Sequence, residues 1–351
     1  MRTLTFSDGA SARLSLATGD ESIILVSMKC LAFGLLTVGA ACSPNTSGSI
    51  TAKCLPLEPA LAISPNGWDG TVFTIVMENK SQGDILGNGQ APYINKLAND
   101  NAIAFGYHDP FVHPSEANYL WMVSGENFGV LDDDDPISHH LDSTSHLADQ
   151  LEMSGLTWHA YQESMGAPCG LVSHGRYAAK HDPFVFFNDI NGWDGAQFQP
   201  SQRCLDNIVD YSQLDKDLEN GTMPKYAFIT PNLDNDMHDG SIAEGDAWLA
   251  HEIPKILASE AYQNGGVLFL LWDEGGGYPA SDDPPFIAIS PNVKKGMKST
   301  ADFDTSAYLK TVEAITGVGA LPCDSATGAH VEMMRELFSM PMTGAATAQA
   351  N

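Results

Sequence analysis

Two nearly uninterrupted apolar segments constrain the fold of this chain more than any other feature. Residues 71–77 have the sequence Thr-Val-Phe-Thr-Ile-Val-Met, and residues 266–272 have the sequence Gly-Val-Leu-Phe-Leu-Leu-Trp. A strand with one side in water alternates apolar and polar residues, whereas runs of this kind are typical of strands buried on both faces. A sheet buried on both faces needs helices on each side, so these segments predict the centre of an α/β/α fold.

Helical and strand-like segments alternate between and after these two runs. We expect helices at residues 92–100, 115–124, 143–154, 200–211, 241–259, 306–315 and 331–338, and further strands at 102–107, 156–161, 226–230 and 285–290. This alternation is typical of a mainly parallel sheet. The predicted fold class is therefore α/β, a three-layer α/β/α sandwich with a mainly parallel central sheet.

The N-terminal region is predicted to lie outside this fold. Residues 28–42 begin with Met28-Lys29 and continue as an apolar run that ends in small residues, as a signal peptide does. The last four residues resemble a bacterial lipoprotein signal in which Cys42 is lipidated, and plain secretion is the alternative. We therefore expect an exported protein with an upstream extension at 1–27, a flexible tether at 43–69, a catalytic domain at 70–340 and a disordered tail at 341–351.

The charge balance excludes one class of partner. The chain has 44 acidic and 17 basic side chains, for a net charge of −27 with neutral histidines. So acidic a protein is not expected to bind nucleic acid. Contact with a membrane is expected only through the N-terminal lipid anchor.

Four cysteines follow the predicted signal segment and allow three disulfide pairings. Export favours their oxidation. Among the three arrangements we favour Cys169 with Cys204 and Cys54 with Cys323.

Acidic residues follow two of the predicted strands. Glu78-Asn79 come directly after the first strand, and Asp273-Glu274 come after the strand at 266–272. Ligands of open parallel sheets bind beyond the carboxyl ends of the strands. Carboxylates gathered in one crevice repel one another unless a divalent cation holds them together, so this pattern indicates a metal site. The alternative is that each acid only caps the helix or loop that follows.

The predicted helix at 115–124 begins with Pro114-Ser115-Glu116. Ser115 would lie at the N-terminus of the helix, where free amide groups favour anions such as phosphate. The alternative is that Ser115 only caps the helix. His113, Asn118 and Tyr119 are polar groups able to face the same crevice.

Six motifs resemble, in order, the phosphoesterase family of bacterial and fungal acid phosphatases and phospholipases C. That family looks like a branch of the alkaline phosphatase superfamily, so the resemblance implies an alkaline phosphatase-like fold. The motifs are Met77-Glu78-Asn79, His113-Pro114-Ser115-Glu116-Ala117-Asn118-Tyr119, His181-Asp182-Pro183-Phe184-Val185-Phe186-Phe187, Ile229-Thr230-Pro231-Asn232, Asp236-Met237-His238-Asp239 and Trp272-Asp273-Glu274-Gly275.

The resemblance also implies roles for individual residues. Ser115 matches the attacking nucleophile, and metal coordination is one of the few ways to favour a serine alkoxide without a histidine base. Attack on phosphorus would give a phosphoserine intermediate that water hydrolyses. The positions that match the metal ligands are Glu78, Asn79, Ser115, Asp273 and Glu274, with Asp236 and Asp239 as further candidates.

The transferred phosphoryl group needs fixed donors for its oxygens. His181 and His238 are the candidates, with Asn118 in support, and His113 is a candidate for orienting Ser115. His181 could instead be a buried structural histidine, and the two aspartates around His238 could be loop caps. For the acidic run at 132–135 we favour a solvated loop, with a calcium site as the alternative.

We therefore expect a metal-dependent, acid phosphatase-like phosphomonoesterase that acts on small phosphate esters. Because the C-terminal extension of phosphocholine-directed phospholipases C is absent from this sequence, a phospholipase C-type phosphodiesterase is the second choice. The third is an inactive surface lipoprotein that binds phosphate or metal. Oxygen ligands suit Mg²⁺, Ca²⁺ or Mn²⁺, and histidine ligands would admit Zn or Fe.

Overall fold

The computed structural model describes residues 3–5, 11–13, 67–277, 281–319 and 332–340. The predicted signal segment, most of the tether, the tail and the proposed Cys54–Cys323 pair lie outside these residues. Near the N-terminus, β1 (Thr3–Thr5) pairs antiparallel with β2 (Ser11–Arg13) in a unit of its own. The remaining elements belong to the unit from Ala52 to Asn351.

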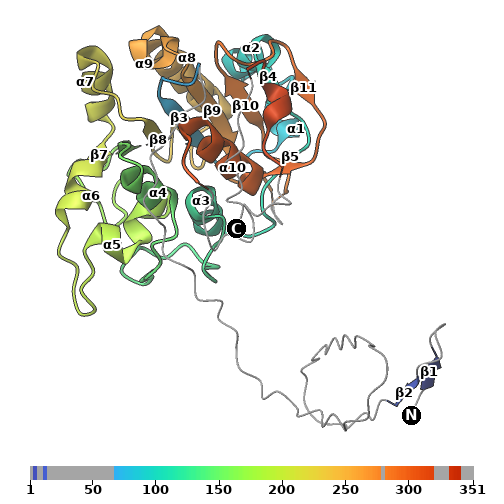
Figure 1. Ribbon diagram of the computed structural model, residues 1–351. Coiled ribbons are helices and arrows are strands. Elements are labelled where there is room, and N and C mark those ends of the chain that lie inside the picture. The colour runs from blue at the N-terminus through green and yellow to red at the C-terminus, as the bar shows by residue number, and fades with distance from the viewer. Residues whose placement is uncertain (1–2, 6–10, 14–66, 278–280, 320–331, 341–351) are drawn as a thin grey trace, which may run out of the picture. The chain divides into compact units, whose positions relative to one another are not determined.

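An eight-stranded sheet forms the centre of the larger unit (Figure 1), in the order β11-β4-β10-β9-β3-β8-β6-β7. Only β10 runs antiparallel to its neighbours, β4 and β9. A small parallel pair, β5 (Tyr107–His108) with β12 (Phe303–Asp304), lies outside this sheet. The bounds of the eight strands are β3 Val72–Met77, β4 Ala102–Ala104, β6 Trp158–Gln162, β7 Ile208–Asp210, β8 Tyr226–Thr230, β9 Val267–Trp272, β10 Phe286–Ile289 and β11 Lys298–Ser299.

Helices cover both faces of the sheet. The α-helices are α1 Gln82–Ile85, α2 Pro92–Asp100, α3 Ser115–Ser124, α4 Leu147–Met153, α5 Asn188–Asn191, α6 Gln202–Asn207, α7 Ser212–Asn220, α8 Ile242–Ala258, α9 Glu260–Gln263 and α10 Thr305–Thr316. Three 3₁₀ helices, η1 Ala179–His181, η2 Pro183–Phe186 and η3 Arg335–Leu337, complete the described elements.

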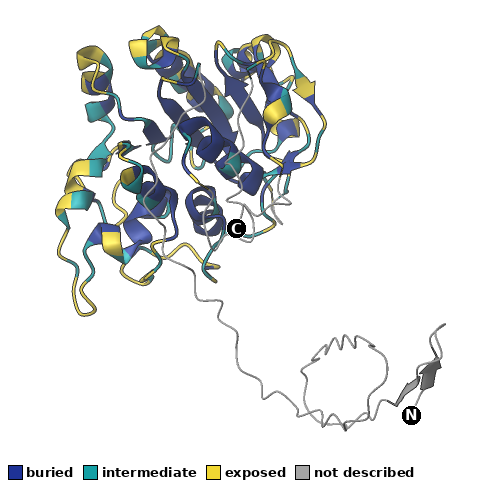
Figure 2. Ribbon diagram, viewed as in Figure 1, coloured by how far each residue is buried: buried dark blue, intermediate teal, exposed yellow. Residues whose placement is uncertain are grey.

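The core consists of two apolar clusters, one on each face of the sheet. Alternate residues of β9 divide between them: Phe269 packs with α3, α4 and α10, whereas Leu268 packs with α2 and α8. Every residue of β3 and β9 is buried, as the two apolar runs predict. Figure 2 shows this buried sheet between helices whose outer sides are exposed. The predicted three-layer α/β/α sandwich with a mainly parallel sheet is confirmed.

The helix predicted at 200–211 is only half right. Helix α6 ends at Asn207, and residues Ile208–Asp210 form edge strand β7, which pairs with β6. Ile208 and Val209 are β-branched, and backbone pairing with β6 prevails over continuation of the helix. The prediction also missed α7 directly after this strand.

The last predicted helix, at 331–338, is also wrong within the described residues. Residues 332–334 are irregular, and only the short 3₁₀ helix η3 forms. Phe338 pairs in an isolated bridge with Val293 and packs its ring against Trp68, with ring centroids 5.2 Å apart. Trp68 is fully buried, so the packed domain includes a residue just before its predicted start at 70.

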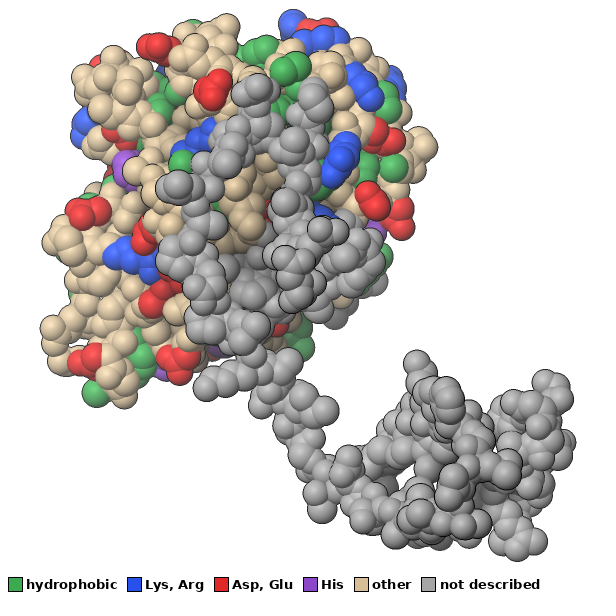
Figure 3. Space-filling model, in the orientation of Figure 1, with side chains coloured by type: hydrophobic (Ala, Val, Ile, Leu, Met, Phe, Trp, Pro, Cys, Tyr) green, Lys and Arg blue, Asp and Glu red, His purple; other side chains and the backbone are tan. Residues whose placement is uncertain are grey.

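Cys169 and Cys204 form a disulfide, as favoured from the sequence. No helix among the described residues combines the length and the apolar character needed to cross a membrane. On the face shown in Figure 3, acidic side chains are scattered among Lys and Arg side chains.

Candidate active site

The carboxyl ends of β3 and β9 bring two acids together. The register pairs Met77 with Trp272, so Glu78 and Asp273, each the next residue, leave the sheet side by side. Both are fully buried. Asn79 adopts a left-handed backbone conformation with a φ of 52°, its N–H donates to Asp273 Oδ1 at 3.1 Å, and its side-chain amide donates to Glu78 Oε2 at 3.2 Å.

Ser115 is the first residue of α3 and lies against these acids. Its hydroxyl donates to Glu78 Oε2 at 3.2 Å, and the side chain is almost completely buried. An interaction with the Ser115 side chain partly offsets the effect of burial on the pKa of Asp273. The hydroxyl therefore hydrogen-bonds the acid that follows β3 and lies close enough to the acid that follows β9 to affect its pKa.

Asp236, on the loop after β8, is the third buried acid of this site, beside Glu78 and Asp273. Its carbonyl oxygen accepts a hydrogen bond from the Glu78 N–H at 2.8 Å. The Lys80 ammonium ties the same two loops together, since it donates to the carbonyl oxygens of Asn79 and Met237. We call Glu78, Ser115, Asp236 and Asp273 the acid crevice.

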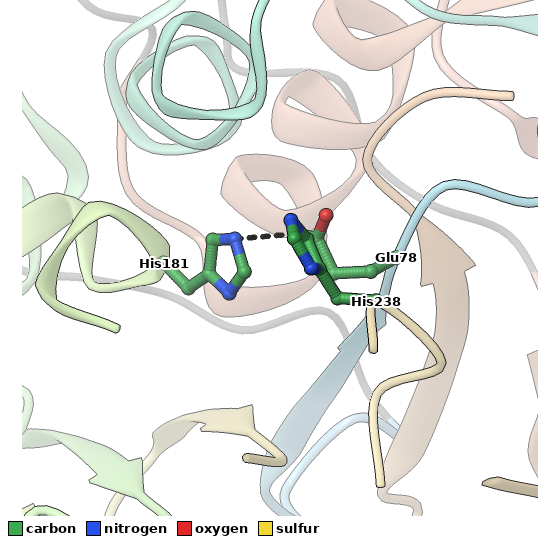
Figure 4. A group of neighbouring side chains, drawn as sticks. All are labelled: Glu78, His181 and His238. Carbon is green, nitrogen blue, oxygen red and sulfur yellow. Dashed lines mark ion pairs between the residues drawn. The ribbon is translucent and has the colours of Figure 1, made fainter. Parts of the chain in front are cut away.

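His181 closes one side of the acid crevice. Its Nε2 lies 3.1 Å from Glu78 Oε1 and its Nδ1 lies 3.4 Å from Asp236 Oδ2. Figure 4 shows the ring pointing at the Glu78 carboxylate, with His238 beside it. The ring stacks on Tyr119, with centroids 5.0 Å apart. Burial lowers the pKa of His181 well below its ordinary value, so the ring is neutral and can donate only one N–H.

The charge of the acid crevice is only partly compensated, because Lys180 lowers the pKa values of Glu78 and Asp236 by less than burial raises them. Burial and the neighbouring charges of Asp273 and Asp236 raise the pKa of Glu78 well above its ordinary value. Burial raises the pKa of Asp273 as well, and raises that of Asp236 to about 8. Glu78 Oε1, Asp236 Oδ2 and Asp273 Oδ2 are buried without a hydrogen-bond partner. Three such oxygens beside one hydroxyl are a donor set that fits a divalent cation.

Glu274 is held by a second set of contacts. Its Oε2 accepts hydrogen bonds from His113 Nδ1 at 2.6 Å and from the Asn118 amide at 3.0 Å. The other ring nitrogen of His113 lies 3.2 Å from Asp282 Oδ1. Burial and the charge of Asp273 raise the pKa of Glu274 to about 7. His113 and Asn118 thus share Glu274 as a partner, and Asn118 also donates to the Val112 carbonyl oxygen. Their roles toward Ser115 and the phosphoryl group stay predictions.

His238 and Asp239 lie at the edge of the crevice. The His238 N–H donates to Asp236 Oδ1 at 2.7 Å, and its ring Nδ1 is 2.9 Å from Asp239 Oδ1. Asp239 also pairs with Arg176 at 2.8 Å, and 42% of its side chain is exposed. Of the two further metal-ligand candidates, the structure thus brings Asp236 into the acid crevice and pairs Asp239 with a cation of the chain itself.

Lys180 is a charged residue of this site that the sequence argument missed. Its ammonium group pairs with Asp133 Oδ2 at 2.8 Å and lies 3.5 Å from His238 Nε2. Burial lowers the pKa of Lys180, but the charges of Glu78 and Asp133 outweigh it and raise the pKa overall. Lys180 and His238 line a cleft of about 400 Å³. The available signal was the place of Lys180 directly before His181 in the motif.

Comparisons with known proteins agree on one family. The model of the Phosphoesterase family matches residues 83–319, a span that begins just after Glu78 and Asn79. Phosphatidylinositol-3-phosphatase of Mycobacterium tuberculosis is 34% identical over 251 residues, which cover 70% of this chain and 77% of that protein. A probable acid phosphatase of Kluyveromyces lactis is 28% identical over 253 residues, covering 69% and 57%. A non-hemolytic phospholipase C of Burkholderia pseudomallei is 24% identical over 254 residues, covering 67% and 35%.

One solved structure supports the fold at low sequence identity, and a second is reported beside it. A Bacteroides thetaiotaomicron protein described in connection with the metabolism of multiple glycosaminoglycans superposes with a TM-score of 0.53 at 11% identity, covering 78% of this chain and 82% of its own. A protein of the alkaline phosphatase superfamily from Vibrio parahaemolyticus gives a TM-score of 0.47 at 12% identity, covering 76% and 72%. At these identities the similarity concerns the fold alone.

Proposed function

Because the chain belongs to the Phosphoesterase family, we propose that it is a metal-dependent phosphomonoesterase that forms a phosphoserine at Ser115. The broader class, a hydrolase of phosphoric esters, follows from the family and from relatives named as phosphatases and phospholipase C. The metal, the intermediate and the preference for small monoesters are the proposed parts. The observation that carries them is the Ser115 hydroxyl, 3.2 Å from Glu78 inside the acid crevice.

The residues present fit a divalent cation. Oxygens of Glu78, Asp236 and Asp273 are buried without partners, and such a set is stabilised by a bound ion. We propose that the ion is held by Glu78, Asn79, Ser115 and Asp273, with Asp236 or Glu274 completing the set. When bound, it would favour the serine alkoxide and neutralise charge on the phosphoryl oxygens. Mg²⁺, Ca²⁺ and Mn²⁺ suit these ligands, and a histidine ligand would admit Zn or Fe.

The chain's own residues then supply proton transfer. In the first step, Ser115 passes its proton to Glu78 Oε2 while its Oγ bonds to phosphorus and the ester P–O bond breaks. We assign protonation of the leaving oxygen to His238, which lines the cleft. In the second step, water attacks phosphorus and gives a proton to His238, the Oγ–P bond breaks, and Ser115 recovers its proton from Glu78.

The surrounding residues position these groups. The short contact of His181 with Glu78, together with the low pKa of its ring, supports a role in holding the carboxylate toward Ser115. Lys180 keeps its charge beside the cleft, so we assign it to the oxygens of the bound phosphate. A cleft of about 400 Å³ suits a small organic phosphate.

Ser115→Ala tests the nucleophile directly. We expect phosphate release from nitrophenyl phosphate to fall on the order of 1,000-fold or more, because the covalent route is lost. The matched control is Ser124→Ala at the other end of α3, where the buried hydroxyl donates only to main-chain oxygens. Acid quenching with labelled substrate should trap phosphoserine in the wild type. Unchanged turnover by Ser115→Ala would refute the assignment.

A phospholipase C-type phosphodiesterase is the second candidate, since one relative carries that name. Comparing turnover of nitrophenyl phosphate with that of nitrophenyl phosphorylcholine separates the two. Preference for the diester would overturn the monoesterase proposal. Activity measured before and after chelation, with metal analysis, tests the dependence on a cation.

We also propose that the enzyme is exported through residues 28–42. The Cys169–Cys204 disulfide supports this proposal, because disulfides persist in oxidising compartments. A fusion of residues 28–42 to a reporter that is active only outside the cytoplasm would test it.

A further inference from the structure

A second group of acids lies beside the first turn of α3. Glu116 follows Ser115 in the chain, but its carboxylate is fully buried and neither oxygen has a hydrogen-bond partner. His139 Nε2 lies 2.7 Å from Asp132 Oδ1 and 3.8 Å from Glu116 Oε1. One ligand atom from each of these three residues lies within 4.8 Å of the others.

The Glu116 carboxylate is not compensated by its surroundings. A buried carboxylate without hydrogen bonds is costly, and the N-terminus of a helix supplies only a partial positive charge. Asp132 and its neighbours Asp133 and Asp134 add further negative charge. The nearby ammonium group of Lys180 is already paired with Asp133.

We propose that Glu116, Asp132 and His139 bind a divalent transition-metal cation at a site separate from the acid crevice. Two carboxylates and one imidazole suit Zn²⁺ or Mn²⁺ better than Ca²⁺, which prefers oxygen ligands alone. Sequence spacing favoured a solvated loop at 132–135, because the run lacks the alternating ligands of a calcium loop. The buried ligand comes from α3, 16 residues before Asp132, and spacing within the run could not reveal it.

The same loop contributes Asp133 to the cleft that Lys180 and His238 line. Asp133 Oδ1 accepts the Glu116 N–H at 3.2 Å, and Asp133 Oδ2 pairs with Lys180 at 2.8 Å. A cation on Asp132 would therefore fix the neighbouring Asp133, and with it the ammonium group that faces His238. The site would stabilise the loop and hold Lys180 in place.

Metal counting in the full chain tests this proposal. The background variant Glu78→Gln/Asp273→Asn removes the acid crevice as a metal site, so the result does not depend on the proposed catalytic metal. After equilibrium dialysis against Zn²⁺, we expect one Zn²⁺ per chain in this background. Adding Asp132→Asn should abolish it, whereas Asp134→Asn, an exposed aspartate of the same loop, should leave it bound.

A thermal melt gives a second measurement that does not rely on one variant. Zn²⁺ should raise the melting temperature of the background variant and of its Asp134→Asn derivative, but not of the derivatives with Asp132→Asn or Glu116→Gln. Circular dichroism confirms that each variant is folded. Absence of Zn²⁺ from the background variant, or its retention after both Asp132→Asn and Glu116→Gln, overturns the proposal. Stabilisation by Ca²⁺ but not by Zn²⁺ or Mn²⁺ overturns the assignment of His139 as a ligand.

Discussion

Two groups of acids and histidines in this protein are similar in composition but differ in how their charge is balanced. In the acid crevice, three buried carboxylates face a neutral histidine and one hydroxyl. The other group surrounds Arg203. Its guanidinium donates to Asp149 at 2.5 Å, to Asp189 at 2.6 Å and to Glu152 at 3.1 Å. His146 lies 3.3 Å from Asp189. We call these five residues the arginine cluster.

The difference shows that clustered acids alone do not indicate a site. His146, Asp149 and Asp189 lie close enough together to hold a metal. The Arg203 guanidinium already pairs with both aspartates, however. Burial raises the pKa of Asp189, yet His146 and Arg203 lower it below its ordinary value overall, while burial keeps that of Asp149 raised. In the acid crevice all three carboxyl groups have raised pKa values. The acids of the proposed active site thus differ from those of the arginine cluster in how their charge is balanced rather than in their number.

Glu78→Gln, in the acid crevice, should have the largest effect on activity of the substitutions compared below. The amide keeps the shape but loses the charge and the proton acceptor for Ser115, so we expect kcat/KM to fall on the order of 1,000-fold. Without metal, the variant should be at least as stable as the wild type, because burial and the neighbouring acids already disfavour the charged form of Glu78 and the amide cannot ionise. Nitrophenyl phosphate assays and urea unfolding in a chelator measure both. A large loss of stability in the chelator would contradict the incomplete compensation of charge in the acid crevice.

Arg203→Met should give the opposite pattern. It leaves three carboxylates without their shared cation, which should lower the free energy of unfolding by roughly 2–3 kcal/mol. This lies below the roughly 3–5 kcal/mol typical of fully buried pairs, because 20% of the Arg203 side chain is exposed. Activity per folded molecule should be unchanged. Urea unfolding and an activity assay on the same preparations check it; equal stability of variant and wild type would show that the arginine cluster is only a surface network.

Much of the fold and the two central acids could be predicted from local pattern. Parallel strands end at one edge of a sheet, so Glu78 and Asp273 had to be neighbours once the two apolar runs were adjacent strands. Short segments were ambiguous: the three residues Ile208–Asp210 become a strand only because β6 offers a partner. The ion pairs between distant residues could not be predicted from the sequence. Lys180 lies 47 residues from Asp133, and Arg203 lies 54 residues from Asp149, so nothing local indicates which acids are compensated.

Lys180→Met tests whether the charge of this lysine, at the edge of the acid crevice, contributes to substrate binding. If the ammonium group binds phosphate oxygens, its loss should raise KM and lower kcat/KM about 10- to 100-fold, roughly the value of one or two charge-assisted hydrogen bonds. Lys180→Arg keeps the charge and should recover part of the loss. Steady-state kinetics of both variants measure this. Equal losses in the two variants would mean that Lys180 acts through packing and not through its charge.

Asp182 offers the most direct measure of a buried carboxyl group without a compensating cation. It is fully buried, its Oδ1 accepts one N–H, from Phe184 at 3.2 Å, and its Oδ2 has no partner. Burial raises its pKa from the ordinary 3.8 to about 8. Between these values the unfolded chain has released the proton and the folded chain has kept it. The unfolding free energy contributed by Asp182 therefore falls as the pH rises from about 4 to about 8, by up to about 1.4 kcal/mol per pH unit.

Asp182→Asn removes this dependence, so the variant should gain stability relative to the wild type between pH 5 and pH 7. Urea unfolding at both pH values measures the difference, with exposed Asp69→Asn as the control that should shift neither value. If the difference between Asp182→Asn and the wild type stayed constant with pH, Asp182 would be ionised in the folded protein. Its charge would then be compensated as in the arginine cluster, and burial without a cation would no longer distinguish the acid crevice.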